Sequence, residues 1–479
     1  MRYLVHLLVL TLAASCGNTE TAPTTENTPL QHPNFIIIVA DDLGWNDLSS
    51  YGNAFTETPN LDRLARQGVR FTSAYAAAPL CSASRSSLMT GLNPVQTNIT
   101  EHIHGNQPAR PDQRLATPFI DQELQLHFTT FAEALREHGY ATGFIGKWHL
   151  GGGGYAPQHQ GFDVNIAGGY EGLPNTYFYP WFRPGSKPEI QDDAQEGDYL
   201  TDVLTDKAID YVSAERDTSF VLYLAYYSPH VPIEGPEDLV EKYRQKRIAS
   251  GQDTSALPNF HYAAMVESID RNVGRLLATL DSLGLAETTA IVFTSDNGGL
   301  HVPSIPGFDK HTPPMKNDPL REGKGYTYEG GMRVPFIVRW PGTAAGVVTD
   351  QPVIGTDLFA TLMDAVGDTT ELAYSNSIIP ALNGPQDYPE RTMIWHNPHY
   401  NHQGHRPSSA IRRGDWKLIH FYETDTDELY DLANDLAERN DLATAHPERV
   451  SELKQALDGA LERMNTQFPS PNPAYTGGE

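Results

Sequence analysis

The sequence predicts an α/β protein in which helices cover both faces of a large, mostly parallel sheet, followed by a small antiparallel sheet with a terminal helix. Three observations predict this class. Strand-like runs such as residues 34–40 are almost continuously apolar, as strands buried on both faces must be. Helical patterns alternate with these runs, which favours a doubly wound sheet with right-handed crossovers. After about residue 390, short clustered strand patterns replace the alternation.

Each element of the large domain, expected over residues 34–390, has a local signal. Its strands are expected at 34–40, 140–146, 219–227, 289–295 and 333–339. Its helices are expected at 59–67, 130–139, 200–214, 259–283 and 357–366. Thr58-Pro59 supplies an N-cap and a first-turn proline for the first helix, and Gly139 ends the second.

A smaller domain is expected over residues 391–479. Its strands are expected at 392–396, 408–413, 415–421 and 427–430, and an amphipathic helix at 448–464. The segment Arg413-Gly414-Asp415 is typical of a hairpin turn. Short strands joined by tight turns favour an antiparallel sheet, which we expect to pack on the large domain.

Composition limits the possible functions. The chain has 479 residues, with 34 Lys and Arg against 60 Asp and Glu, and a formal net charge of −26. This acidity excludes a nucleic-acid-coating protein, because phosphate backbones need a basic face. An anionic substrate would need local positive charge, since salt screens distant charges over roughly 8 Å. Two cysteines exclude a disulfide framework and a four-cysteine zinc site.

The first 16 residues have the layout of an export signal. Met1 and Arg2 precede an apolar run that is too short to span a bilayer, and small residues lead to Cys16. The segment before Cys16 resembles a bacterial lipobox, in which the cysteine is lipidated. Residues 17–33 are polar and rich in Pro and Thr, as in a flexible tether. We therefore expect a membrane-anchored lipoprotein of the bacterial periplasm or outer membrane, with cleavage and secretion as the alternative.

Polar side chains follow two of the predicted strands. Asp41-Asp42 comes directly after the strand at 34–40, and Asp296-Asn297 after the strand at 289–295. In open α/β sheets, ligands bind beyond the carboxyl ends of the strands. Three carboxylates and an amide oxygen suit a hard divalent ion. We expect Ca²⁺, with Mg²⁺ as the alternative. Taken singly, both segments are also ordinary strand-exit turns.

The second cysteine has an unusual setting. The run Cys81-Ser-Ala-Ser-Arg85 precedes an apolar helical stretch with Leu88-x-Thr90-Gly91. A lone cysteine is normally a small buried packing residue. Here the amides of a helix N-terminus together with Arg85 would favour an anionic group instead.

This run resembles the nucleophile motif of the formylglycine-dependent sulfatases of the alkaline-phosphatase-like superfamily, with Ala83 where the commonest form has Pro. The resemblance extends from about residue 33 to the terminal helix. Residues 146–151, 228–232 and 323–331 match further segments of the family in the family's order. The short motif alone is a weak signal, but this coincidence of ordered segments is specific. It implies an alkaline-phosphatase-like fold and a sulfuric ester hydrolase.

The resemblance also implies the site residues. The metal ligands would be Asp41, Asp42, Cys81, Asp296 and Asn297. The catalytic residues would be Cys81, Arg85, Lys147, His149, His230 and Lys324. A formylglycine-generating enzyme would oxidise Cys81 during maturation, and the hydrated aldehyde would be the nucleophile. Taken alone, Lys147 could instead be a solvated cation at a strand end, and His230 a hydrogen-bonded loop residue before Pro232.

Roles for these side chains follow from the family. Arg85 would hold the formylglycine hydrate, and Lys147 and Lys324 would clamp sulfate oxygens. His230 would protonate the leaving oxygen, and His149 would accept the proton whose loss expels sulfate and regenerates the aldehyde.

An exported enzyme of this kind fits sulfated oligo- or polysaccharides such as ulvan, carrageenan or glycosaminoglycan. The candidate rim residues are His396, His399, His402, His405 and Arg406. Pro398 and Gly404 disfavour one helix and therefore a zinc face, while a sugar-binding rim and an ordinary surface loop both remain open. Four aromatic residues could stack on sugars or pack their own insertion: Tyr170, Tyr177, Tyr179 and Trp181.

Two other functions remain open. One is a phosphomonoester or phosphodiester hydrolase with the same fold and nucleophile. The other is a non-catalytic surface lipoprotein that binds sulfated glycan, which we would expect if Cys81 stays unmodified.

Overall fold

The computed structural model describes residues 32–104, 108–183, 190, 194–302, 311, 313–383 and 391–477, and His32–Glu479 form one compact unit. The predicted export signal, Cys16 and the predicted tether up to residue 31 lie outside the described residues. Within the described residues, no helix combines the length and the apolar character needed to cross a membrane.

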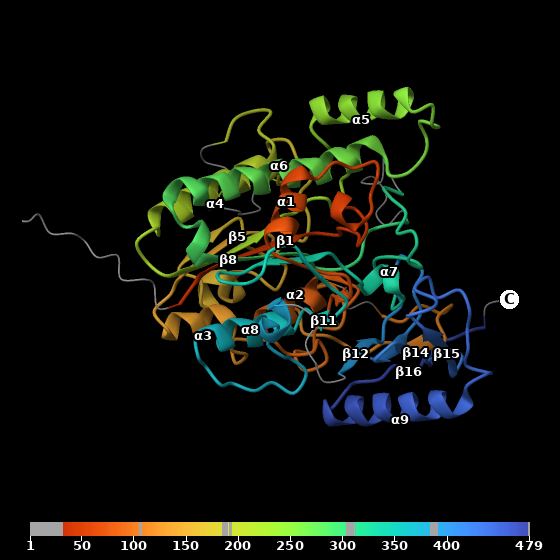
Figure 1. Ribbon diagram of the computed structural model, residues 1–479. Coiled ribbons are helices and arrows are strands. Elements are labelled where there is room, and N and C mark those ends of the chain that lie inside the picture. Colours follow the sequence, from red (N-terminus) through yellow and green to blue (C-terminus); the bar gives the residue numbers. More distant parts are fainter. Residues whose placement is uncertain are drawn as a thin grey trace, which may run out of the picture. The chain divides into compact units, whose positions relative to one another are not determined.

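An eight-stranded sheet forms the centre of the larger part of this unit (Figure 1). In spatial order its strands are β10 (Val347–Thr349), β2 (Val69–Phe71), β9 (Phe336–Arg339), β8 (Thr289–Ser295), β1 (Asn34–Ala40), β7 (Phe220–Ala225), β5 (Ala141–Gly146) and β6 (Val164–Ile166). The strands from β8 to β6 run parallel, whereas β9 is antiparallel to both β8 and β2. The carboxyl ends of β1, β5, β7 and β8 therefore meet at one edge.

Successive side chains of β1 enter two separate cores. Ile36 and Ile38 pack with one helical layer, formed by α1 (Pro59–Gln67), α4 (Leu200–Ala214) and α6 (Phe260–Leu283). Phe35 and Ile37 pack with the other, formed by α2 (Cys81–Thr90), α3 (Phe131–Glu137) and α8 (Asp357–Ala365). Figure 1 shows the two layers on either side of the sheet, with α5 (Glu237–Ala249) against α6. This double-sided burial explains the continuous apolar runs in the sequence.

The predicted fold class is confirmed. The predicted strands and helices form within two residues of their expected bounds, apart from β9, which begins three residues later than expected. The elements that sequence analysis missed are α5, α7 (Glu329–Met332), β2, β6, β10, β3 (Ala74–Tyr75), β4 (Leu115–Ala116), β11 (Val353–Ile354) and β16 (Ser470–Pro471). Strands of two or three residues are too short to display an alternating pattern, and α5 is dominated by charged residues.

A four-stranded antiparallel sheet forms the C-terminal part of the unit. Its strands follow chain order: β12 (Thr392–Asn397), β13 (Ser408–Arg413), β14 (Trp416–Phe421) and β15 (Thr426–Asp431). One face, including Ile411 and Leu418, packs on α9 (Pro447–Arg463). The other face packs Trp395 and Ile419 against Tyr75 and Ile354 of the larger part.

A buried network of charged side chains joins the two sheets. The ammonium of Lys417 on β14 lies 3.0 Å from Glu329 Oε1 at the start of α7 and 2.8 Å from Glu438 Oε1. Glu329 Oε2 also accepts hydrogen bonds from Tyr75 Oη (2.8 Å) and Arg333 Nη1 (3.0 Å). Burial opposes ionisation of Glu329, but the Lys417 charge holds its pKa at about 2. Burial raises the pKa of Glu438 to about 7 despite the same lysine.

Candidate active site

The carboxyl ends of β1 and β8 bring together two pairs of polar residues, Asp41-Asp42 and Asp296-Asn297, of which Asp42 and Asp296 are 254 positions apart in the sequence. Asp42 donates its backbone N–H to Asp296 Oδ1 at 3.2 Å, and Asn297 Nδ2 donates to Asp42 Oδ1 at 2.8 Å. Asp41, Asp42, Asp296 and Asn297 are all buried. Asp42 has a left-handed backbone conformation, with φ of 64°, which turns its side chain into this group at some cost in strain.

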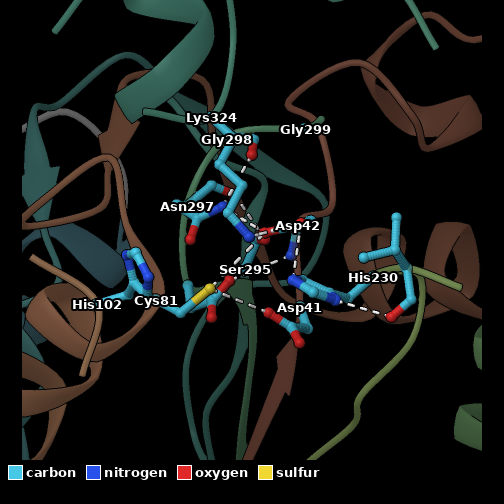
Figure 2. Close-up of polar contacts among 12 residues, drawn as sticks. Asp41, Asp42, Cys81, His102, His230, Ser295, Asn297, Gly298, Gly299 and Lys324 are labelled. Carbon is cyan, nitrogen blue, oxygen red and sulfur yellow. Dashed lines mark hydrogen bonds and ion pairs between the residues drawn. The ribbon is translucent and has the colours of Figure 1, made fainter. Parts of the chain in front are cut away.

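Cys81 is the first residue of α2, and its side chain meets this group (Figure 2). The sulfur lies 3.5 Å from Asp41 Oδ1 and 3.9 Å from Asp42 Oδ1. Burial and the charge of Asp296 raise the pKa of the thiol above its ordinary value, so the thiol stays protonated at neutral pH. An unmodified Cys81 is therefore a poor nucleophile in this setting.

Three cationic side chains hold the carboxylates. Arg85 Nε and Nη2 both lie 2.9 Å from Asp296 Oδ2. Lys147 Nζ lies 2.7 Å from Asp41 Oδ2, and Lys324 Nζ lies 2.8 Å from Asp42. Burial raises the pKa of Asp41 to about 8 in spite of Lys147. Burial also opposes ionisation of Asp42 and Asp296, but Lys324 holds the pKa of Asp42 and Arg85 holds the pKa of Asp296 below the ordinary value. Among the three carboxylates, Asp41 is thus the one whose cationic partners do not offset its burial.

Two glycines allow the strand ends to reach the site. Gly146, at φ of 107°, ends β5, and a Cβ there would lie 1.8 Å from the carbonyl oxygen of Ala225. A Cβ on Gly298 would lie 1.9 Å from the carbonyl oxygen of Gly330. These close approaches place Lys147 beside the end of β7 and bring the start of α7 against the end of β8.

Two histidines complete the group. His230 Nε2 lies 3.6 Å from Asp42 Oδ2, and its Nδ1 lies 2.9 Å from the carbonyl oxygen of Val231, which fixes Nδ1 as the protonated nitrogen of the neutral ring. Burial and Lys324 lower the pKa of His230 to about 3. Burial and Lys147 also hold the pKa of His149 well below its ordinary value. The Nδ1 atom of His149 is buried without a hydrogen-bond partner and is available to a ligand.

The donor set fits a divalent cation. Ligand atoms of Asp41, Asp42, Cys81 and His230 all lie within 4.8 Å of one another. Asn297 Oδ1 is buried and has no hydrogen-bond partner, which a cation would supply. Asp296, predicted as a ligand, lies in the same group, but its two oxygens are engaged by Arg85 and by the Asp42 N–H. Oxygen donors of this kind suit Ca²⁺ or Mg²⁺.

A cavity of about 260 Å³ opens at Cys81. Four of its lining residues belong to the group just described: Cys81, His149, His230 and Lys324. The other lining residues, which we call the cavity mouth, are Leu80, His102, Ile103, His104, Gly172, Leu173, His402 and Gln403. Cys81, Lys324 and the two histidines therefore share one cavity that a small anionic group can enter, whereas Arg85 and Lys147 are not among its lining residues.

Comparison with known families agrees with this geometry. The profile of the sulfatase family matches residues 33–368, well over half of the chain. The chain belongs to the sulfatase family. A second profile, described as N-sulphoglucosamine sulphohydrolase, C-terminal, matches residues 323–467 of this sulfatase. The protein is therefore a sulfuric ester hydrolase, as predicted.

Several relatives and solved structures match this sulfatase over nearly its whole length. A protein named sulfatase from Formosa agariphila is 31% identical over 91% of this chain and 88% of its own length. An N-acetylgalactosamine-6-O-sulfatase from Bacteroides thetaiotaomicron is 30% identical over 90% of this chain and 94% of its own. The crystal structure of Ps i-CgsB in complex with k-i-k-neocarrahexaose is 27% identical with a TM-score of 0.72, covering 93% of this chain and 95% of that chain.

The five predicted rim residues do not form one surface beside the cavity, and each has its own surroundings. Only His402 is among the residues that line the cavity at Cys81, whereas His399 lines a neighbouring groove. His396 is buried against Ser409 and Gln467, and His405 against Ser408. The guanidinium of Arg406 lies 3.7 Å from Glu423.

Three of the four aromatic residues considered as sugar-stacking candidates, Tyr177, Tyr179 and Trp181, pack within the protein. Tyr177 is fully buried and donates to the carbonyl oxygens of Tyr227 and His230, so it positions the His230 loop. Trp181 is fully buried as well, and Tyr179 packs against it. Tyr170 remains exposed, with its ring 4.0 Å from that of His104 at the cavity mouth.

Sequence analysis missed several residues of the cavity mouth, above all His102, His104 and Gln403. The first two lie in Glu-His-Ile-His at residues 101–104, where histidines alternate with other residues. That alternation of histidines soon after the Cys81 helix could have indicated that the segment lies at the site.

Proposed function

We propose that this sulfatase removes sulfate groups from sulfated carbohydrates, such as ulvan, carrageenan, glycosaminoglycan or their oligosaccharides, through formylglycine made from Cys81. The observation that carries the proposal is the position of Cys81 at the cavity, 3.5 Å from Asp41 and among three cationic residues. The name of the Bacteroides thetaiotaomicron relative and the oligosaccharide bound in Ps i-CgsB support a carbohydrate substrate.

The proposal includes one divalent cation, preferably Ca²⁺, held by Asp41, Asp42, Asp296 and Asn297 together with the side chain at position 81. When bound, the cation would offset the negative charge of the sulfate group and favour ionisation of the nucleophile. Among the described residues of the site, three carboxylates already take up three cationic side chains. With a divalent ion on Asp41 and Asp42, the ammonium groups of Lys147 and Lys324 would become available to the substrate, while Arg85 would stay on Asp296.

Lys147 and Lys324 would then hold sulfate oxygens. Both ammonium groups are buried on carboxylate oxygens of the proposed metal ligands, and Lys324 also lines the cavity. Each can donate up to three hydrogen bonds, and in a water-excluded site such bonds stabilise the charge that develops on the transferring group. Arg85, bound to Asp296 and to the Lys147 carbonyl at 2.7 Å, would keep α2 and position 81 in place.

Two histidines would move protons. His230 keeps Nδ1 on the Val231 carbonyl, so Nε2 is the atom that exchanges a proton with the leaving oxygen. The low pKa of His230 depends on burial and on Lys324, and an anionic substrate near Lys324 would offset part of that charge. His149, neutral and with an unpartnered Nδ1, would serve as the proton acceptor at position 81.

Turnover and mass spectrometry together test this function. The purified enzyme is expected to release sulfate from defined sulfated oligosaccharides and to prefer an aryl sulfate to the matching aryl phosphate. The peptide that contains position 81 should be about 18 Da lighter than its cysteine form, as conversion to formylglycine requires. A preference for the phosphate ester would instead indicate a phosphoester hydrolase. Glycan binding without turnover by a chain with unmodified Cys81 would indicate a binding protein.

Removal of divalent cations is expected to lower both activity and thermal stability. The buried carboxylates would lose a partner, and a ligand at a hundred times its Kd stabilises the folded state by about 2.7 kcal/mol. The measurement is the Tm and aryl sulfate turnover after EGTA treatment, with Ca²⁺ and Mg²⁺ added back separately. Ca²⁺ should restore both, and Asp42→Asn should show no Tm response to Ca²⁺. An unchanged Tm and turnover after EGTA would contradict the cation site.

We also propose that the enzyme acts outside the cytoplasm, in the periplasm or outer membrane, anchored by a lipid on Cys16. The export-signal layout of residues 1–16 and the composition of residues 17–33 support this location. An extracytoplasmic enzyme would meet polysaccharides and their fragments directly.

A further inference from the structure

A second groove continues outward from the cavity at Cys81. It has a volume of about 430 Å³ and shares His102, His104 and His402 with the cavity. Its other lining residues are Glu101, Pro108, Arg110, Gln113, Thr117, His399, Tyr400 and Asn401. The cavity and the groove therefore adjoin, and the three shared histidines belong to the walls of both.

A buried pair, Glu101 and His102, stands where the groove joins the cavity. The Glu101 carboxylate accepts hydrogen bonds from the His102 ring at 2.6 Å and from the His102 backbone N–H at 2.9 Å. Burial opposes its ionisation, but His102 lowers the pKa of Glu101 to about 2. Since Nδ1 of His102 is bound to Glu101, Nε2 is the ring nitrogen left for a ligand. Figure 2 shows this ring beside Cys81.

The backbone around this pair is held firmly. Ser82, directly after Cys81, accepts a hydrogen bond from the Ile103 N–H at 3.1 Å and donates to the His149 carbonyl at 2.9 Å. The His104 N–H donates to Gln122 Oε1 at 2.7 Å. The segment that carries His102 is therefore fixed relative to the nucleophile position, as a specificity-determining side chain requires.

Two hydrogen-bond donors of the groove matter for a ligand, His102 Nε2 and the guanidinium of Arg110, whereas Tyr400 Oη and Asn401 Nδ2 already donate to Glu423 and to the Gly325 carbonyl. Among its described lining residues, Glu101 is the only one with a carboxylate, and that carboxylate is already hydrogen-bonded to the His102 ring. Arg110 supplies a positive charge, and its partner Asp112, at 3.1 Å, is exposed like Arg110 itself. Exposed ion pairs of this kind contribute little because water solvates both charges, so a ligand can displace Asp112 at little cost. The chain as a whole is acidic, with a net charge of −26, but the lining of this groove offers hydrogen-bond donors. The groove therefore suits a ligand group that only accepts hydrogen bonds.

We propose that this groove binds the sugar unit next to the one that carries the scissile sulfate, and that this neighbouring unit bears an anionic group. His102, oriented by Glu101, and Arg110 contact that group, which is a sulfate ester or a carboxylate. The inference rests on the proposed function and narrows its substrate class to oligosaccharides with at least two anionic groups. Arg110 and His102 are specificity-determining residues in this assignment.

The test compares kcat/KM for three oligosaccharides that carry the same sulfated terminal unit and differ only in its neighbour: neutral, sulfated or uronate. The intact enzyme should prefer at least one anionic neighbour by about tenfold, the size of one charge-assisted hydrogen bond. The two anionic substrates distinguish a sulfate reader from a carboxylate reader. Arg110→Ala should remove most of the preference, and His102→Gln should reduce it.

Arg216→Ala is the matched control, because Arg216 is also an exposed arginine paired with a neighbouring aspartate, at 3.5 Å from Asp217. It should keep the preference of the intact enzyme. Equal kcat/KM for all three substrates, or a preference that Arg110→Ala leaves intact, would overturn the groove assignment while the sulfatase function stands. Failure to hydrolyse any of the three, or an aryl sulfate, would instead overturn the proposed function.

Discussion

Replacing Cys81 by alanine or serine is expected to abolish sulfate release while the fold is retained. An alanine methyl group and an unmodified serine hydroxymethyl group are not aldehyde hydrates, so neither offers a second hydroxyl to expel sulfate once it has been transferred. Loss of a covalent nucleophile typically costs several orders of magnitude in kcat, and we expect at least about a thousandfold. Both substitutions are small and remove or shorten a side chain that fills little of the core.

The check is sulfate release from an aryl sulfate, together with the unfolding midpoint of each variant. Met89→Leu is the control, because Met89 is buried in the same helix but faces the α3 and α8 core instead of the cavity. It should retain both stability and turnover. Multiple turnovers by Cys81→Ala at a rate near that of the intact enzyme would contradict the assignment of the nucleophile.

Replacing Lys417 by methionine is expected to lower the free energy of unfolding by about 3–5 kcal/mol, since two buried carboxylates lose their shared cation and Arg333 compensates only Glu329. Lys417, Glu329 and Glu438 are each 0% exposed, so water cannot take the place of the ammonium. Turnover should fall as well. Glu329 begins α7 directly after the Lys324 segment, whose backbone is tied to Gly299 and Pro79.

Denaturant unfolding of Lys417→Met measures this loss. The double variant Lys417→Met with Glu438→Gln should recover part of it, because only one carboxylate then remains and Arg333 pairs with that one at 3.0 Å. Lys454→Met is the surface control, since Lys454 pairs with Asp458 on the exposed side of α9 and should cost less than about 1 kcal/mol. If Lys417→Met unfolds at the same denaturant concentration as the intact protein, the network does not stabilise the junction of the two sheets.

The residues at the strand ends could be predicted from the sequence because a parallel sheet leaves little freedom there. Once β1 and β8 are recognised as buried parallel strands, Asp41 and Asp296 must lie at the same edge. The family motif then adds Cys81, and the structure brings its sulfur into contact with Asp41. Apolar periodicity carries the same information for the long helices, which is why their bounds were predicted closely.

The cavity mouth and the charged network could not be predicted in this way. His102 and Gln403 lie in irregular segments 301 positions apart, and no periodic pattern connects them. Lys417 looks like an ordinary polar residue of a small antiparallel sheet until Glu329 and Glu438 are seen to enclose it. Contacts of this kind depend on how irregular segments close on one another, and a one-dimensional pattern does not encode that closure.

The burial of Cys81 sets an order of events in biogenesis. Every residue of α2 is enclosed, and Cys81 is only 2% exposed. If Cys81 is converted to formylglycine as proposed, a maturing enzyme of macromolecular size would reach this thiol only while the chain is still unfolded, before the helix packs on the sheet. Protein collected from a host that lacks the maturing activity would be trapped in its thiol form, and supplying that activity afterwards would rescue it only if the chain were first unfolded.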